Sequence, residues 1–152
     1  MKLANALSQR SEMQTRLRQL ENRLYNNAQV QEGETPAEDP EELLKELEED
    51  YVRLEKLVSA INRTNCATRT EGGDTLSDLL ARRDCLKGKL NTLRNFLDNA
   101  SALVRRRTAS EIKIRSTVDV RALQKQIDGL SKELRQLEEV IQEKNWTTEL
   151  LL

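Results

Sequence analysis

Arginine and asparagine side chains interrupt the apolar stripes of this sequence, and such groups can bind an anion. Arg10 replaces an apolar residue in the first stripe, Asn62 and Asn65 lie at the end of the second, and Arg83 interrupts the third. A guanidinium group donates several hydrogen bonds in a fixed planar array, which suits carboxylate and phosphate ligands. A buried arginine must otherwise pair with acidic or amide side chains, and such a network can serve only to fix helix register.

Both interpretations apply to one end of the predicted fold, where the polar residues are expected to meet. The candidate residues of this polar end are Arg10, Asn62, Arg63, Asn65, Arg82, Arg83, Asp84, Asn145 and Trp146. They form either a pocket for a small anion or small ligand, or a network that only fixes helix register. Trp146 is predicted to cover the end of the core, with anchoring of a partner as the alternative.

The absence of histidine excludes several kinds of active site. Histidine-dependent nucleophiles, two-histidine metalloprotease helices and ferritin-like di-iron sites cannot be built. Cys66 and Cys85 are too few and too far apart for a zinc ribbon or a disulfide framework, so reduced thiols are expected. The Gly72-Gly73 pair lacks the lysine and the preceding strand of a phosphate-binding loop. We therefore predict a protein that is not an enzyme and that has no catalytic residues, no metal site and no cofactor.

Charge is balanced overall but segregated locally. The chain has 25 basic and 26 acidic residues, whereas residues 105–115 hold five basic side chains against Glu111, and residues 38–50 hold eight acids against Lys45. The basic patch comprises Arg105, Arg106, Arg107, Lys113 and Arg115. It either neutralises the acidic segment within the chain or meets a phosphate-rich partner. Nucleic acid is not expected, because aromatic residues do not alternate with the basic ones.

Apolar residues spaced alternately three and four apart predict four long helices to position these groups. The helices are expected at about 2–28, 40–65, 75–104 and 118–145, with connectors at 29–39, 66–74 and 105–117. Asp39 before Pro40 predicts the N-cap and first residue of the second helix. The stripe assigned to the second helix is Leu44, Leu47, Tyr51, Leu54, Val58 and Ile61.

The predicted fold is all-α, a single domain over residues 1–152 built as a long, coiled-coil-like antiparallel four-helix bundle. The alternative is two helical hairpins that open and exchange with a second chain. Alternating apolar and charged residues also predict a short two-stranded β-ribbon between about 28–32 and 111–116. No apolar run approaches the roughly 18 residues needed to span a membrane, and the first ten residues lack the core of a signal peptide, so we expect a cytoplasmic protein.

Four stretches carry a resemblance to a known family. They are NNAQVQEGETPAEDP at 26–40, INRTN at 61–65, SEIKIRSTVDV at 110–120 and NWTTEL at 145–150. Together they resemble the septicolysin-like family of small bacterial coiled-coil proteins, largely described as uncharacterised. The resemblance implies a helical, cytoplasmic bacterial protein, and it carries over no catalytic residues. The family name implies a cytolysin.

Three functions follow from these observations. The first is a protein-interaction module that associates with itself or with another protein, because long amphipathic helices form and extend bundles. The second is binding of a small anion or small ligand at the polar end. The third is the membrane activity that the family name implies.

Overall fold

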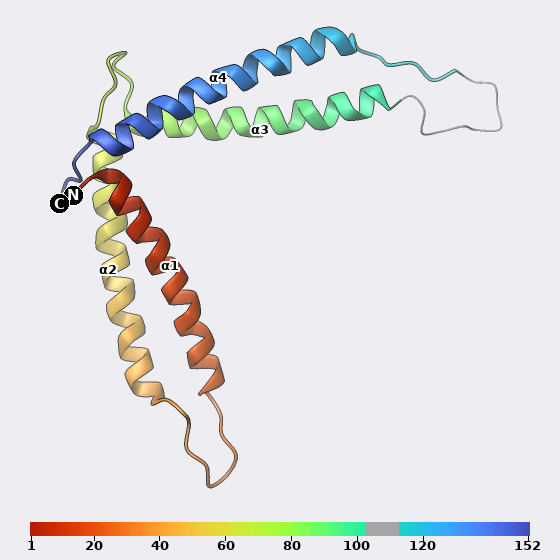
Figure 1. Cartoon of the computed structure of the whole chain (residues 1–152). Coiled ribbons are helices and arrows are strands. Elements are labelled where there is room, and N and C mark those ends of the chain that lie inside the picture. Colours follow the sequence, from red (N-terminus) through yellow and green to blue (C-terminus); the bar gives the residue numbers. More distant parts are fainter. Residues whose placement is uncertain (103–112) are drawn as a thin grey trace. The chain divides into compact units, whose positions relative to one another are not determined.

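Four α-helices account for most of the chain. The computed structural model describes residues 1–102 and 113–152. The helices are α1 (Leu3–Asn26), α2 (Pro40–Ala67), α3 (Leu76–Ser101) and α4 (Val120–Thr147), as Figure 1 shows. The all-helical prediction is confirmed for the described residues, and each helix begins and ends within three residues of its predicted bounds.

Local sequence signals account for the helix starts. Asp39 Oδ1 accepts a hydrogen bond of 2.9 Å from the backbone N–H of Glu41, and Pro40 occupies the first helical position of α2. Asp119 Oδ1 likewise accepts from the N–H of Ala122 at 3.0 Å in the first turn of α4. Both carboxylates satisfy N–H groups that have no partner within the helix.

The chain divides into two compact units. The first unit comprises Met1–Thr75 and Lys144–Leu152, and the second comprises Leu76–Glu143. In the first unit α1 and α2 lie side by side as a helical hairpin, and in the second α3 and most of α4 do the same (Figure 1). Ion pairs from Arg16 to Asp50 and from Arg23 to Glu46 show that α1 and α2 are antiparallel, because the higher-numbered arginine meets the lower-numbered acid.

The core of the first unit corrects the stripe predicted for the second helix. Leu43 and Asp50 are buried, whereas Leu44 and Tyr51, one position further along, are each 55% exposed. Residues seven apart lie on the same face of a helix after two turns, so Leu43 and Asp50 form the row that faces α1. Ile61 is buried as expected. Leu47, Leu54 and Val58 of the predicted stripe are half-buried, so the stripe is wrong only in placing Leu44 and Tyr51 in the core.

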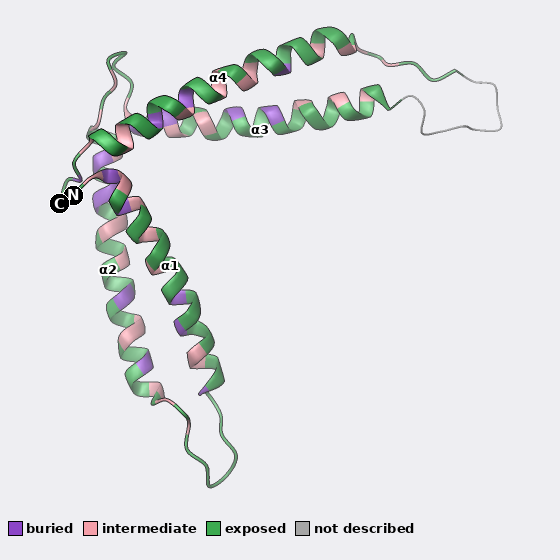
Figure 2. Ribbon diagram, in the orientation of Figure 1, coloured by how far each residue is buried: buried purple, intermediate pink, exposed green. Residues whose placement is uncertain are grey.

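Leucine and isoleucine side chains form the core of the second unit. Leu86, Leu90 and Ile127 are buried at its centre. The partly buried side chains packed around them are Leu93, Leu97, Leu123, Leu130 and Leu134. Figure 2 shows the buried positions as short bands along each helix, with exposed surface between them. Two helices alone cannot enclose a leucine row on every side, which explains the partial burial.

The predicted β-ribbon is not found in the described residues. Residues 28–32 form a bend and a turn, and 113–116 have no regular structure. Residues 111 and 112, which belonged to the second predicted strand, lie outside the described part of the chain. The alternating apolar pattern that suggested a strand covers only part of the connector. A pattern this short does not by itself specify a strand, so tertiary context decides the conformation.

The C-terminal segment is bonded to the start of α1 and to the end of α2. The backbone N–H of Leu3 donates to the carbonyl of Thr148 at 2.9 Å, and the N–H of Leu150 donates to the carbonyl of Met1 at 2.8 Å. Thr64, which is fully buried, accepts from the N–H of Leu151 through Oγ1 at 2.9 Å and donates to the carbonyl of Ala60 at 2.8 Å.

Thr64→Val is expected to lower the free energy of unfolding by about 1–3 kcal/mol, because it leaves the Leu151 N–H without its acceptor at nearly unchanged side-chain volume. Native-state hydrogen exchange should show faster exchange of the Leu151 amide. Thr64→Ser keeps the hydroxyl and serves as the control, so its Leu151 amide should stay protected. Equal exchange rates in Thr64→Val and wild type would contradict the assignment.

Candidate functional site

One flank of the α1/α2 hairpin is closed by ion pairs. Arg16 lies 2.7 Å from Glu46 and 2.8 Å from Oδ2 of the buried Asp50. Arg23 contacts Glu38 at 2.5 Å and Glu46 at 3.5 Å. The hydrogen bond from Arg23 holds the pKa of Glu38 below its ordinary value. Charged side chains therefore bridge the two helices along this flank, which we call the ion-paired flank.

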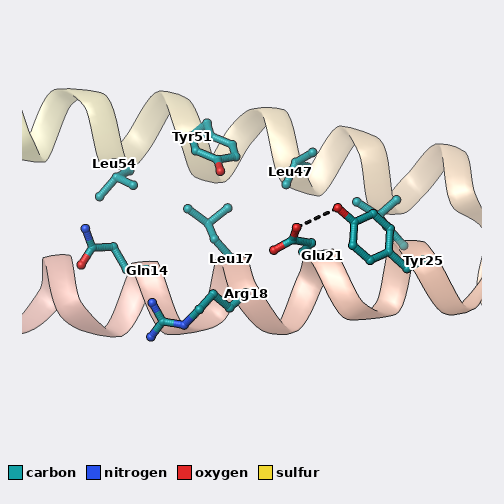
Figure 3. Close-up of a pocket in the computed structure, with 9 residues that line it drawn as sticks. Gln14, Leu17, Arg18, Glu21, Tyr25, Leu47, Tyr51 and Leu54 are labelled. Atoms are coloured by element: carbon teal, nitrogen blue, oxygen red, sulfur yellow. Dashed lines mark hydrogen bonds between the residues drawn. The ribbon is translucent and has the colours of Figure 1, made fainter.

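The opposite flank is open and apolar, and we call it the open flank. A groove of about 570 Å³ runs between the two helices there. It is lined by Gln14, Leu17, Arg18, Glu21, Leu24 and Tyr25 of α1 and by Leu47, Tyr51 and Leu54 of α2. Figure 3 shows Leu17, Leu47 and Leu54 lying between the two ribbons, with Tyr51 beside them. No charge pair bridges the helices within this set.

Two tyrosines lie at this groove. Tyr25 is 69% exposed and Tyr51 is 55% exposed. The Tyr25 hydroxyl donates to Glu21 at 2.7 Å, the bond drawn in Figure 3, and this bond raises the pKa of Tyr25. Leu44 precedes Leu47 by one helical turn and continues the apolar row toward the start of α2. Tyrosine and leucine side chains of this exposure are the groups that interfaces bury.

The sequence contained a signal for this groove that the prediction misread. Leu43, Asp50 and Leu57 repeat every seven residues and so do Leu44, Tyr51 and Val58, which gives α2 two adjacent rows that are apolar except at Asp50. Two helices need only one row to pack together. A second row therefore indicates a further packing surface. Tyr25 was not singled out at all, and its position eleven residues after Gln14, on the same side of α1, is the signal that would have found it.

The predicted polar-end residues are divided between the two compact units. Arg10, Asn62, Arg63, Asn65, Asn145 and Trp146 lie in the first unit, and Arg82, Arg83 and Asp84 lie in the second. Within the first unit the structure brings Asn62 and Arg63 together with Cys66 beside a shallow hollow on α2. The anion pocket that would use all nine residues stays a prediction.

Several arginines of that set already have partners. Arg63 donates to the hydroxyl of Ser59 at 3.0 Å, and Arg82 pairs with Glu133 at 2.6 Å. Arg83 pairs with its neighbour Asp84 at 2.8 Å. The Nε atom of Arg10 is buried and has no hydrogen-bond partner among the described residues.

Trp146 does not cover the core as predicted, because its side chain is 61% exposed. Of the predicted basic patch, Arg105, Arg106 and Arg107 lie outside the described residues, while Lys113 and Arg115 are exposed. A separate hollow in the second unit brings Arg83, Lys87 and Arg135 close to Glu138 and Glu139. Lys87 is paired with Glu138 at 2.7 Å, so cations and carboxylates largely offset each other there.

The best-defined charge cluster joins the N-terminus to the C-terminal segment. The Met1 amino group lies 2.8 Å from Glu149, and Lys2 Nζ lies 2.9 Å from it. Hydrogen bonds from the Met1 amino group and from Lys2 lower the pKa of Glu149 from 4.5 to about 2. A carboxyl whose pKa is lower in the folded chain stabilises the fold above its unfolded pKa, and the contribution disappears as the pH falls through the folded pKa.

Glu149→Gln is therefore expected to be less stable than wild type at neutral pH, with the difference shrinking as the pH falls from about 4.5 to about 2. Denaturant unfolding at a series of pH values measures this difference. Glu71→Gln, the same substitution at an exposed position in a turn, provides the matched control for the loss of a carboxylate. A constant difference across that window would contradict the ion-pair assignment.

Comparison with known proteins assigns the chain to a family. Residues 10–150 match the family described as "Family of unknown function (DUF6847)". The chain belongs to this family. The DUF6847 match covers α2, α3, α4 and most of α1. The septicolysin-like resemblance stays a prediction, because the comparisons contain nothing that concerns that family.

A solved structure is similar to this DUF6847 chain over its full length. It is the crystal structure of a functionally unknown conserved protein from Corynebacterium diphtheriae, with 45% sequence identity, a TM-score of 0.92, and coverage of 99% of each chain. No curated protein matches.

Within residues 1–102 and 113–152, no helix combines the length and the apolar character that crossing a bilayer requires. The same residues contain no group of three or more Cys, Asp or Glu side chains placed to hold a metal ion.

Proposed function

We propose that this protein is a non-enzymatic, bacterial protein-interaction module that self-associates through its helical hairpins. The observation that carries the proposal is the difference between the two flanks of the α1/α2 hairpin. Ion pairs bridge one flank, and a groove lined by four leucines, two tyrosines and three other polar residues remains open on the other.

The open flank has the composition of an interface. Leu17, Leu24, Leu47 and Leu54 supply an apolar floor, and Tyr51 supplies a large aromatic surface with a polar tip. Aromatic side chains concentrate binding energy at interfaces, whereas scattered exposed leucines do not require a partner. The row from Leu44 to Val58 is continuous over about 21 Å at the helical rise of about 1.5 Å per residue. A continuous row of this length is the kind of surface that a third and a fourth helix cover in a bundle.

The second unit supports the same proposal independently. Leu93, Leu97, Leu123, Leu130 and Leu134 are only partly buried against the centre of the α3/α4 hairpin. Phe96 is 45% exposed on α3, and Val140 is 38% exposed on α4. Both hairpins thus leave apolar surface that additional helices would cover. The four-helix bundle expected within one chain is, in this proposal, completed between copies.

Sedimentation equilibrium of the wild-type chain over a hundredfold range of concentration tests the proposal. The apparent mass is expected to rise from 17.5 kDa toward a multiple of that value as the concentration increases. A mass of 17.5 kDa at every concentration would contradict self-association. High salt should not abolish association, because the apolar groove is expected to contribute most of the binding free energy.

A further inference from the structure

We infer that the open flank of the α1/α2 hairpin binds the same flank of a second copy, with α1 of each copy packed against α2 of the other. This inference rests on the proposed function and deepens it by naming the surface, the occupant and the orientation. The resulting assembly is a two-fold symmetric four-helix bundle made of two hairpins. Its axis runs parallel to the helices, so that all neighbouring helices are antiparallel.

Charge at the rims of the groove favours this orientation. The net charges of whole helices do not decide it, because Arg16 and Arg23 of α1 already pair with acidic residues on the ion-paired flank. Glu21, which lines the groove, accepts the Tyr25 hydrogen bond. The rim charges that remain include Arg18 on α1 and Glu48 on α2. Placing α1 of one copy against α2 of the other brings these unlike charges together at both contacts.

The two rim charges lie at the edge of the apolar row. Arg18 lies on the α1 rim, where its guanidinium donates an exposed hydrogen bond to the Thr15 hydroxyl at 2.9 Å. Glu48 is exposed on α2, three residues before Tyr51 and four after Leu44, so it borders the same apolar row. Neither side chain belongs to the ion-paired flank.

The ion-paired flank fixes which residues lie at the same height. Arg16 pairs with Asp50, and Arg23 pairs with Glu46. Residue 18 of α1 is therefore level with residues near 48 of α2. The two-fold rotation about an axis parallel to the helices does not shift residues along the helices. A residue of α1 therefore lies level with the same residues of the partner's α2 as of its own α2. Arg18 of each copy then faces Glu48 of the partner subunit, and the pair occurs twice.

The area is sufficient for a stable pair. A hairpin face about 20 Å wide, from two helices of about 10 Å each, and about 36 Å long covers roughly 700 Å² per copy. Specific interfaces bury about 800 Å² per partner, so the face has the size of an ordinary dimer interface. Shape and charge together therefore favour a second copy of this hairpin as the occupant.

The test uses two charge-reversal variants of the full chain, Arg18→Glu and Glu48→Arg. Each variant alone places like charges together at both contacts of the symmetric pair, and its association should weaken about tenfold or more at 0.15 M salt. A mixture of the two variants restores both contacts, because each introduced side chain then faces an unlike charge. Its association should return to within about threefold of wild type.

Controls separate this inference from the broader proposal. Lys56→Glu makes the same charge change as Arg18→Glu at an exposed position away from the groove lining and should associate like wild type. Circular dichroism should show unchanged helix content for all variants, since Arg18 and Glu48 are exposed. Sedimentation velocity at matched concentrations gives the association constants.

Each outcome decides a question. Restoration in the mixture supports the symmetric pairing. Loss in each variant without restoration in the mixture overturns it and points to the α3/α4 hairpin or another protein as the occupant. Wild-type association that neither variant changes also overturns the inference, but it leaves the proposed function standing. A wild-type chain that never associates overturns both.

Discussion

The Tyr51→Glu variant is expected to remain monomeric at concentrations at which the wild-type chain self-associates. Tyr51 lies between Leu47 and Leu54 along the groove and is 55% exposed in the single chain. The proposed pair buries two Tyr51 rings, one from each copy. A glutamate at that position would place a carboxylate against an apolar surface without a partner, which costs more free energy than the loss of the ring alone.

The expected loss of affinity is at least about 30-fold, since interface residues of this kind contribute about 2 kcal/mol or more. Val52→Glu is the matched control. Val52 is the next residue, is 41% exposed, and is not part of the groove. Its association constant should stay within about threefold of wild type. Equal losses in Tyr51→Glu and Val52→Glu would show that the groove has no special role.

The second large effect is on folding. Leu90→Ala is expected to lower the free energy of unfolding by about 2–5 kcal/mol. Leu90 is 1% exposed and lies in the cluster with Leu86 and Ile127, so truncation leaves a cavity that a two-helix core cannot easily close. Chemical denaturation monitored by circular dichroism measures the change.

Val140→Ala provides the comparison for this prediction. Val140 is 38% exposed, and alanine is a better helix former than valine, so a change within about 0.5 kcal/mol is expected. A loss at Leu90 no larger than the loss at Val140 would contradict the assignment of Leu90 to the core of the second unit.

Helix positions were predictable because their signals are local. The apolar spacing, Asp39 before Pro40, and the Gly72-Gly73 turn before α3 all act within a few residues. The row of α2 that faces α1 was not predictable by the same means. Leu43 and Leu44 are chemically identical, and the row that faces α1 includes Asp50, whose carboxylate contacts Arg16 across the hairpin. A charged residue at a buried position between the two helices is an exception to the rule that buried residues are apolar.

The residues of the candidate site were also only partly predictable. Functional residues were predicted where polar groups interrupt the apolar stripes, as with Arg83. In the structure, Arg82 and Arg83 have acidic partners. The open flank is lined mainly by residues assigned to the core, including Leu17 and Tyr51. Composition alone cannot distinguish a residue that packs within the hairpin from one that packs against a partner, because both are apolar and both follow helical spacing.

Site-directed disulfide formation between copies tests the central claim most directly. The two native thiols, Cys66 and Cys85, are exposed and would be replaced by serine. One preparation then carries Arg18→Cys and the other carries Glu48→Cys, and the two are mixed and oxidised. The proposed pairing predicts a covalent dimer of twice 17.5 kDa in the mixture, formed faster than with Lys56→Cys in place of Glu48→Cys. Cross-linking no faster than in that control would contradict the proposed pairing of the two open flanks.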